Sequence, residues 1–170
     1  MVDEEKSVFT IRPLDATDRN WVAHFLDTHW SSTKIVTRGQ AYYAHLLPGF
    51  VAALEDAPED ATPAGMITYR IDGDQCEIMT LNSLSPGQGI GAALVKAVRE
   101  VAKENGCKRM WLIITNDNMH ALRFLQKNNF RLAMVHVDAL SEARKLKPQI
   151  PLVGENGIPL HDELELSMKL

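Results

Sequence analysis

A glycine turn that runs directly into an amphipathic helix constrains this chain more than any other segment. The turn is Gln88-Gly89-Ile90-Gly91-Ala92, and the residues before it, 76–81, have the composition of a strand. The first backbone N–H groups of a helix have no helical partner, and the helix dipole favours negative charge there. Glycines let that backbone approach a phosphate closely. The segment therefore predicts a site for a phosphorylated ligand at residues 87–93, although a capped tight turn would use the same glycines.

Composition bounds the class of protein. A chain of 170 residues, 45% of them apolar, fits one domain with a sizeable core. The net charge of −4 gives no broad basic face, so we expect neither a nucleic acid nor a membrane as partner. No apolar run approaches a membrane span, and the acidic N-terminus lacks a signal-peptide core, which predicts a cytoplasmic protein. Cys76 and Cys107 are too few for a disulfide framework or a metal site, and we expect both to be reduced.

Local patterns predict an α+β order of elements. Helices are expected after the capping residue Asp15, from about Ile90 to Asn105 with Gly106 as its cap, and from about Asn118 to Asn128. Two segments, 29–45 and 141–162, are expected to be irregular. Strands are expected at residues 9–11, 50–54, 66–71, 75–81, 110–114, 130–137 and 164–168, with a hairpin turn at 72–74. No repeat or linker interrupts this order, so residues 1–170 are predicted to form a single domain.

Two other nucleotide-binding motifs contain a glycine turn similar to this one. Gly87-x-Gly89-x-x-Ala92 matches a dinucleotide fingerprint, which requires an acidic residue at the end of the next strand and a parallel sheet. That strand ends here in Thr115-Asn116, and the strands before the turn form hairpins. A phosphate loop of the nucleotide-hydrolase type is excluded because no Gly-Lys-Ser/Thr follows.

The whole order resembles the GNAT superfamily of N-acetyltransferases, from the first strand to the last and most closely over residues 75–132. The family's turn begins with Arg or Gln, where this chain has Pro86, and continues here as Gly87-Gln88-Gly89-Ile90-Gly91. Its Asn-x-x-Ala is Asn118-Met119-His120-Ala121. The resemblance implies a mixed, mostly antiparallel sheet of about six to seven strands flanked by helices.

The resemblance also implies acetyl-CoA as co-substrate. Its pyrophosphate would lie on the backbone amides of the turn, and its pantetheine would add to the free edge of the strand at Met79 and Leu81. Asn118 and Asn116 would bind the pantetheine arm, although an asparagine there also serves as a helix N-cap. The cofactor-binding residues expected on this basis are Met79, Leu81, Gly87, Gln88, Gly89, Ile90, Gly91, Ala92, Asn116 and Asn118.

Direct attack by an amine on the thioester requires a base and a way to protonate the leaving thiolate. Glu77, on the strand beside the cofactor, is the predicted catalytic base, with a solvent-facing carboxylate as the alternative. Many members of the family use a tyrosine as the acid, and the matching position here is Leu125. Asp162 and Glu163 could enter the acceptor pocket from the last strand, but a solvated charge run is the preferred interpretation.

The predicted function is acetyl transfer from acetyl-CoA to a primary amine of a small molecule. A non-catalytic acyl-CoA-binding module on the same fold is the alternative, and the chain is expected to be a monomer or a homodimer without a metal ion. The acceptor side is expected to include Trp30, Ser31, Ser32, Thr33, Tyr42, Tyr43 and the segment 141–162. The sequence does not name the amine.

Overall fold

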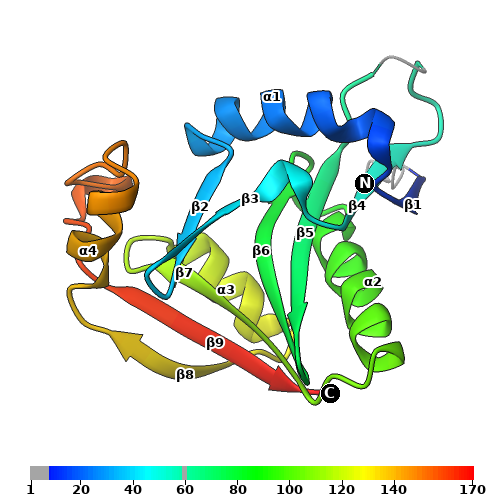
Figure 1. Cartoon of the computed structure of the whole chain (residues 1–170). Helices are drawn as coiled ribbons and strands as arrows, with labels where there is room; N and C mark the ends of the chain where they lie inside the picture. Colours follow the sequence, from blue (N-terminus) through cyan, green and yellow to red (C-terminus); the bar gives the residue numbers. More distant parts are fainter. Residues whose placement is uncertain (1–7, 59–60) are drawn as a thin grey trace, which may run out of the picture.

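The computed structural model describes residues 8–58 and 61–170, and a seven-stranded sheet runs through them (Figure 1). The strand order is β1-β4-β5-β6-β7-β9-β8, within the predicted number of strands. All neighbours are antiparallel except β6 and β7, as the sequence predicted for a mixed, mostly antiparallel sheet. The strands are β1 (Phe9–Pro13), β4 (Gly49–Leu54), β5 (Gly65–Asp72), β6 (Gln75–Ser83), β7 (Arg109–Thr115), β8 (Arg131–His136) and β9 (Glu163–Lys169).

Helices cover both faces of the sheet because its strands place apolar side chains on both. Met66 on β5 packs with α1 (Arg19–Trp30), whereas the next residue, Ile67, belongs to the core beneath α2 (Ile90–Glu104). Successive side chains of a strand point to opposite faces, so this apolar run requires a layer on each side. The helix α3 (Met119–Lys127) lies on the α2 side through Leu125. A small antiparallel hairpin of β2 (Lys34–Thr37) and β3 (Gln40–Tyr43) follows α1 in the chain.

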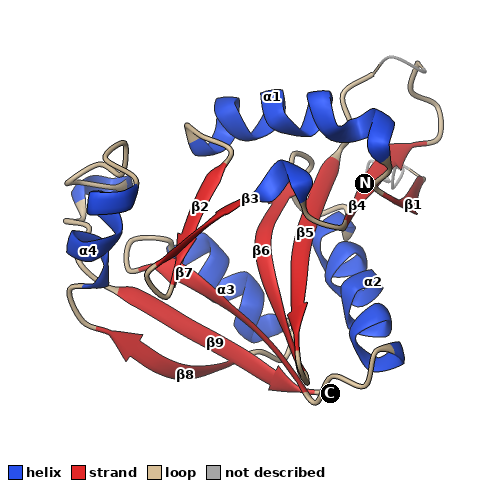
Figure 2. Ribbon diagram, in the orientation of Figure 1, coloured by secondary structure: helices blue, strands red, loops and turns tan. Residues whose placement is uncertain are grey.

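The parallel pair β6–β7 is short, and this shapes the molecule. Only residues 75–77 of β6 pair with residues 109–111 of β7, and Glu77 and Trp111 form the last pair. Beyond it the two strands diverge, as Figure 2 shows, and β7 continues its pairing with β9 alone. The edge of β6 that faces β7 is therefore unpaired from Ile78 onward, as strand addition by a pantetheine arm would require.

Two segments expected to be irregular contain regular structure. Within 29–45, Arg38 and Gly39 have positive φ angles of 48° and 74° and join β2 to β3. Positive φ at both central residues is the geometry of a tight hairpin turn. The helix α4 (Ala139–Leu146) extends into 141–162 and buries Leu140 and Ala143, which are three residues apart on one helix face. Three short 3-10 helices, η1 (Ala16–Asp18), η2 (Ala44–Leu46) and η3 (Glu155–Gly157), complete the elements.

A buried carboxylate connects the second half of the sheet to the β2–β3 turn. Glu165 on β9 is 2% exposed and accepts hydrogen bonds from Arg38 at 3.0 Å, from Arg109 on β7, and pairs with His136 on β8 at 2.8 Å. Burial opposes the charge, but these donors outweigh it and lower the pKa of Glu165 to about 2. The Arg38 guanidinium also stacks 4.0 Å from the Trp111 ring centroid. The hairpin is thereby held against the sheet.

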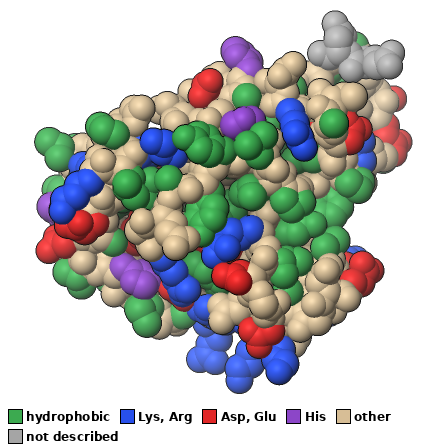
Figure 3. All heavy atoms as spheres, in the orientation of Figure 1, with side chains coloured by type: hydrophobic (Ala, Val, Ile, Leu, Met, Phe, Trp, Pro, Cys, Tyr) green, Lys and Arg blue, Asp and Glu red, His purple; other side chains and the backbone are tan. Residues whose placement is uncertain are grey.

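The described residues show the following surface features. Apolar and charged side chains are interspersed over the face in Figure 3. Within the described residues, no helix is both long and apolar enough to span a bilayer. Those residues also include no group of three His, Cys, Asp or Glu side chains placed to hold a metal ion. Cys76 and Cys107 are both buried and unbonded to each other, and burial raises the pKa of Cys76 to about 12.

Candidate active site

Two adjoining cavities occupy the cleft where β6 and β7 diverge. One, of about 330 Å³, runs along β6 toward α3, and the other, of about 360 Å³, opens toward α4 and β9. They share walls formed by the end of α1, the middle of both strands and the start of α3. The shared residues are His29, Trp30, Ile78, Met79, Ile113, Ile114 and Asn118. The cavities therefore form two chambers that meet between the strands, and we call them the β6 cavity and the β9 cavity.

The predicted phosphate turn has the backbone geometry expected of it. Gly87 and Gly89 have φ angles of 80° and 82°, and Gly89 is the N-cap of α2. The first helical hydrogen bond runs from Ala93 to the carbonyl of Gly89 at 3.0 Å, so the N–H groups of residues 89–92 precede it. Gly91 has a different reason to be glycine, because a Cβ there would lie 3.1 Å from the Phe124 ring. It allows α2 and α3 to pack closely.

The two asparagines differ in what they do. Asn118 lines both cavities and caps α3, since its side-chain oxygen accepts the Ala121 N–H at 3.0 Å. This confirms the N-cap, and its amide NH2 makes no hydrogen bond within the described residues. Asn116 lines neither cavity: its oxygen accepts the His161 and Asp162 N–H groups, and its nitrogen donates to Pro159. It organises the segment before β9.

Glu77 lies at the floor of the β9 cavity, not on the solvent face. It is 3% exposed, accepts the Thr37 hydroxyl at 2.7 Å and accepts the Arg70 guanidinium at 2.9 Å. Each carboxylate oxygen thus has a donor, one from the β2–β3 hairpin and one from β5. Its position at the last β6–β7 pair fixes it where the strands begin to diverge.

Glu163 is a second carboxylate in the same cavity, and it has no such partners. It is 7% exposed and begins β9, and its carboxylate makes no hydrogen bond or ion pair with the described residues. Burial raises the pKa of its carboxyl group, His136 opposes that shift and Glu77 adds to it. The expected solvated charge run is therefore wrong for Glu163, because α4 and the β2–β3 hairpin enclose this face of β9.

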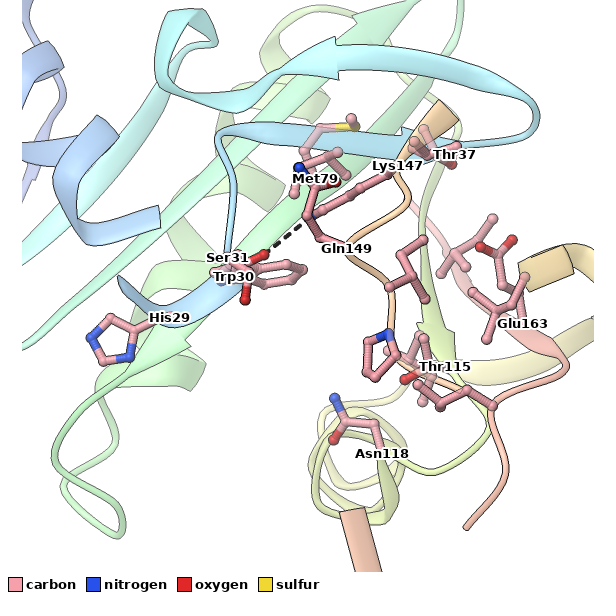
Figure 4. A pocket seen from close by; sticks show the side chains of 18 of the residues that line it. His29, Trp30, Ser31, Thr37, Met79, Thr115, Asn118, Lys147, Gln149 and Glu163 are labelled. Carbon is pink, nitrogen blue, oxygen red and sulfur yellow. Dashed lines mark hydrogen bonds between the residues drawn. The ribbon is translucent and has the colours of Figure 1, made fainter. Parts of the chain in front are cut away.

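Lys147 brings the opposite charge into the β9 cavity from the segment after α4. It is 8% exposed, and its ammonium donates to the Trp30 carbonyl at 3.1 Å, the bond dashed in Figure 4. Burial, followed by the nearby Lys34, lowers the pKa of Lys147. Arg144 on α4 holds the loop beyond it by donating to the carbonyls of Pro151 and Leu160 at 2.7 and 2.8 Å.

Comparison with known proteins identifies this arrangement. Residues 18–130 match the Acetyltransferase (GNAT) family. This chain belongs to the GNAT acetyltransferase family. The uncharacterized protein YxbD of Bacillus subtilis (strain 168) is 40% identical over 160 residues, 94% of this chain and 98% of that protein.

Solved GNAT structures share the fold. A family member from Elizabethkingia anophelis with acetyl-CoA bound is 21% identical, with a TM-score of 0.64 over 95% of this chain and 98% of its own. A Bacillus subtilis acetyltransferase in complex with CoA is 19% identical, with a TM-score of 0.66 over 96% and 99%. The predicted family and fold are confirmed, and the predicted co-substrate, acetyl-CoA, is that of the family.

This GNAT protein departs from the common pattern at the acid. Leu125 is 1% exposed and belongs to the core at the β6 cavity, and no tyrosine among the described residues lines either cavity. Tyr42 and Tyr43, expected on the acceptor side, lie elsewhere: the Tyr42 ring is 4.8 Å below Arg70, and Tyr43 is 52% exposed. Trp30 and Ser31 do line the β9 cavity, as expected (Figure 4).

Sequence reasoning did not assign Lys147 or Glu163 a role. A signal for Glu163 exists in the alternation Glu163-Leu164-Glu165-Leu166, which places both acids on one face of β9. Nothing local shows that this face is covered, because α4 and the hairpin that cover it come from distant segments.

Proposed function

We propose that this protein transfers the acetyl group of acetyl-CoA to the primary amine of a small molecule, acting as one domain. The observation that carries the proposal is the pair of joined cavities, with buried carboxylates in the chamber away from the β6 edge. The pyrophosphate would bind the N–H groups of residues 88–92, and the pantetheine arm would follow Met79 and Leu81 past Asn118. The thioester would then reach the junction of the cavities. A chamber of about 360 Å³ suits a small acceptor.

In the proposed reaction the amine nitrogen attacks the thioester carbonyl carbon, and the carbon–sulfur bond breaks as the amide forms. The acceptor must first lose its ammonium proton, for which a buried carboxylate serves as the base. Glu77, the base predicted from the sequence, has both oxygens engaged by donors that favour its charged form. Glu163 has no such donors, and its raised pKa brings it nearer the working pH. These features favour Glu163 as the proton acceptor, with Glu77 as the alternative. In this proposal, water protonates the departing thiolate.

The test is release of free CoA from acetyl-CoA with a panel of primary amines, followed by a thiol reagent and by mass spectrometry of the product. Both cysteines of the protein are buried, so the thiol signal reports CoA. We expect Glu163→Gln to lower kcat by roughly 10²-fold and to remove the acidic limb of the pH–rate profile. A Glu163→Gln enzyme with the wild-type rate, beside an inactive Glu77→Gln enzyme, would return the role to Glu77. Acetyl-CoA binding without CoA release for every amine would favour the non-catalytic module.

A further inference from the structure

The wall of the β9 cavity formed by the segment after α4 carries a positive charge that the protein leaves without a counter-charge. Lys147 is 8% exposed, and the carbonyl of Trp30 is the acceptor it contacts. No carboxylate lies within ion-pair distance of its nitrogen among the described residues. An ammonium has three hydrogen-bond donors, so two remain for a molecule in the cavity.

The fold compensates this charge only in part: the Trp30 carbonyl ends α1, where the helix dipole favours a cation, but no carboxylate among the described residues neutralises it. A buried charge without a partner costs free energy, and the neighbouring Lys34 adds like charge. An apolar side chain would fill the same space without that cost. Positions where a sequence departs from such rules and the fold does not fully compensate the cost are commonly functional.

Glu163 presents the complementary charge to the same cavity. It too is buried, its carboxylate has no hydrogen-bond or ion-pair partner among the described residues, and Figure 4 shows it projecting from β9, apart from Lys147. The cavity that both residues line has apolar side chains as well as the polar Thr37, Thr115 and Gln149. The apolar lining residues are Ile35, Ile78, Ile114, Leu140, Ile150 and Leu160. The cavity thus offers a cation, an anion and apolar wall surface.

We propose that the acceptor is an amino carboxylate whose carboxylate binds Lys147 and whose ammonium is received by Glu163. This inference rests on the proposed function, since Glu163 then takes the proton that the attacking amine must lose. A carboxylate accepts charge-assisted hydrogen bonds from an ammonium, and these are stronger than neutral ones. The apolar wall residues contact the carbon skeleton between the two charged groups, or a side chain beside them.

Acetyl-CoA is a less suitable partner for Lys147. Its phosphates are expected at the start of α2, and Lys147 lines the β9 cavity without lining the β6 cavity. The group that faces Lys147 therefore belongs to the acceptor and not to the donor.

The experiment compares acceptors that differ only by a carboxylate. Glycine, β-alanine, 4-aminobutyrate and 6-aminohexanoate are paired with methylamine, ethylamine, propylamine and pentylamine, and L-phenylalanine is paired with 2-phenylethylamine. We expect at least one amino carboxylate to exceed its partner in kcat/KM by roughly 10- to 100-fold, the range of one hydrogen bond to a charged group. The length series reports which spacing of charges fits the cavity.

Two lysine variants assign that preference to a residue. Lys147→Met is expected to reduce the preference to within about threefold of unity, and Lys147→Arg to retain part of it. Lys145→Met is the matched control, because Lys145 lies on α4 with a 69% exposed side chain paired to Glu142, and its preference should equal that of the wild type. Unfolding measured in parallel should give Lys147→Met a stability equal to or above that of the wild type.

Each outcome decides the proposal. Equal kcat/KM within every pair would overturn it and leave the proposed function standing. A preference that survives in Lys147→Met, together with lower stability, would make Lys147 a structural tie to Trp30 and would also overturn it. If no amine yields CoA, calorimetric titration of the CoA-bound protein with the same amino carboxylates decides. Binding that Lys147→Met weakens tenfold supports the proposal, and no binding of any of them refutes it.

Discussion

The ion cluster around Glu165 allows a quantitative prediction for the substitution Glu165→Gln. The carboxylate is 2% exposed and its pKa is lowered from 4.5 to about 2 by Arg109, His136 and Arg38 against the opposing effect of burial. At about 1.4 kcal/mol per pKa unit, this difference corresponds to roughly 3 kcal/mol of stability at neutral pH. Removing one partner of a buried ion pair typically costs about 3–5 kcal/mol, so the two routes agree. For a chain of this size we expect the melting temperature to fall by roughly 6–12 °C.

The stability difference between the wild type and Glu165→Gln should depend on pH. Because the pKa is lower in the folded protein, the carboxylate stabilises the fold above pH 4.5, and that contribution is lost as the pH falls toward 2. The wild type should therefore exceed Glu165→Gln by roughly 3 kcal/mol at pH 7, and the difference should shrink steadily below about pH 5. Urea unfolding monitored by circular dichroism at a series of pH values measures both quantities.

The matched control is Glu142→Gln on α4. Glu142 pairs with Lys145 at 2.8 Å, but both side chains are largely exposed, at 70% and 69%. Exposed pairs contribute little, so the change should stay within about 0.5 kcal/mol. A loss below about 1 kcal/mol for Glu165→Gln, or one that does not diminish in acid, would refute the reasoning.

Two further substitutions test the site. Gly89→Ala should weaken CoA binding measured by calorimetry. Gly73 also has a positive φ and open space around an added Cβ, so Gly73→Ala should share the strain of roughly 1 kcal/mol but keep the wild-type CoA affinity. Equal CoA affinities of the two variants would place the phosphates elsewhere. Glu163→Gln should stabilise the protein at neutral pH, because a carboxyl whose pKa is raised in the folded state destabilises the fold as the pH rises above 4.5. In urea unfolding, the extra stability of Glu163→Gln over the wild type should vanish near pH 4. A Glu163→Gln protein less stable than the wild type at roughly pH 8 would show that the Glu163 carboxylate is paired.

The sequence predicted the glycine turn and the start of α2 better than the structure around the β9 cavity, for a physical reason. The start of α2 depends on one continuous strand, turn and helix, so the glycines at 87 and 89 reveal it locally. The β9 cavity is enclosed by the end of α1, the β2–β3 hairpin, α4 and β9, which are far apart in the chain. Two of these elements were expected to be irregular, although Arg38-Gly39 marked a turn and Leu140 with Ala143 marked a helix face. Without that cover, Glu163 had the pattern of a surface residue.

The acidic residues on this face of the sheet separate into two kinds, and the separation carries the functional argument. Glu77 and Glu165 are buried with donors supplied by Thr37, Arg70, Arg38 and Arg109, so the protein neutralises them itself. Glu163 lies two residues from Glu165 on the same face of β9, and its carboxylate has no hydrogen-bond donor among the described residues, as Lys147 has no carboxylate. A chain that supplies partners to two carboxylates and withholds them from the third leaves the third for a ligand. Natural proteins commonly accept a loss of stability at the groups that act on substrate. On this reasoning the charges that the fold leaves unpaired mark where the acceptor binds.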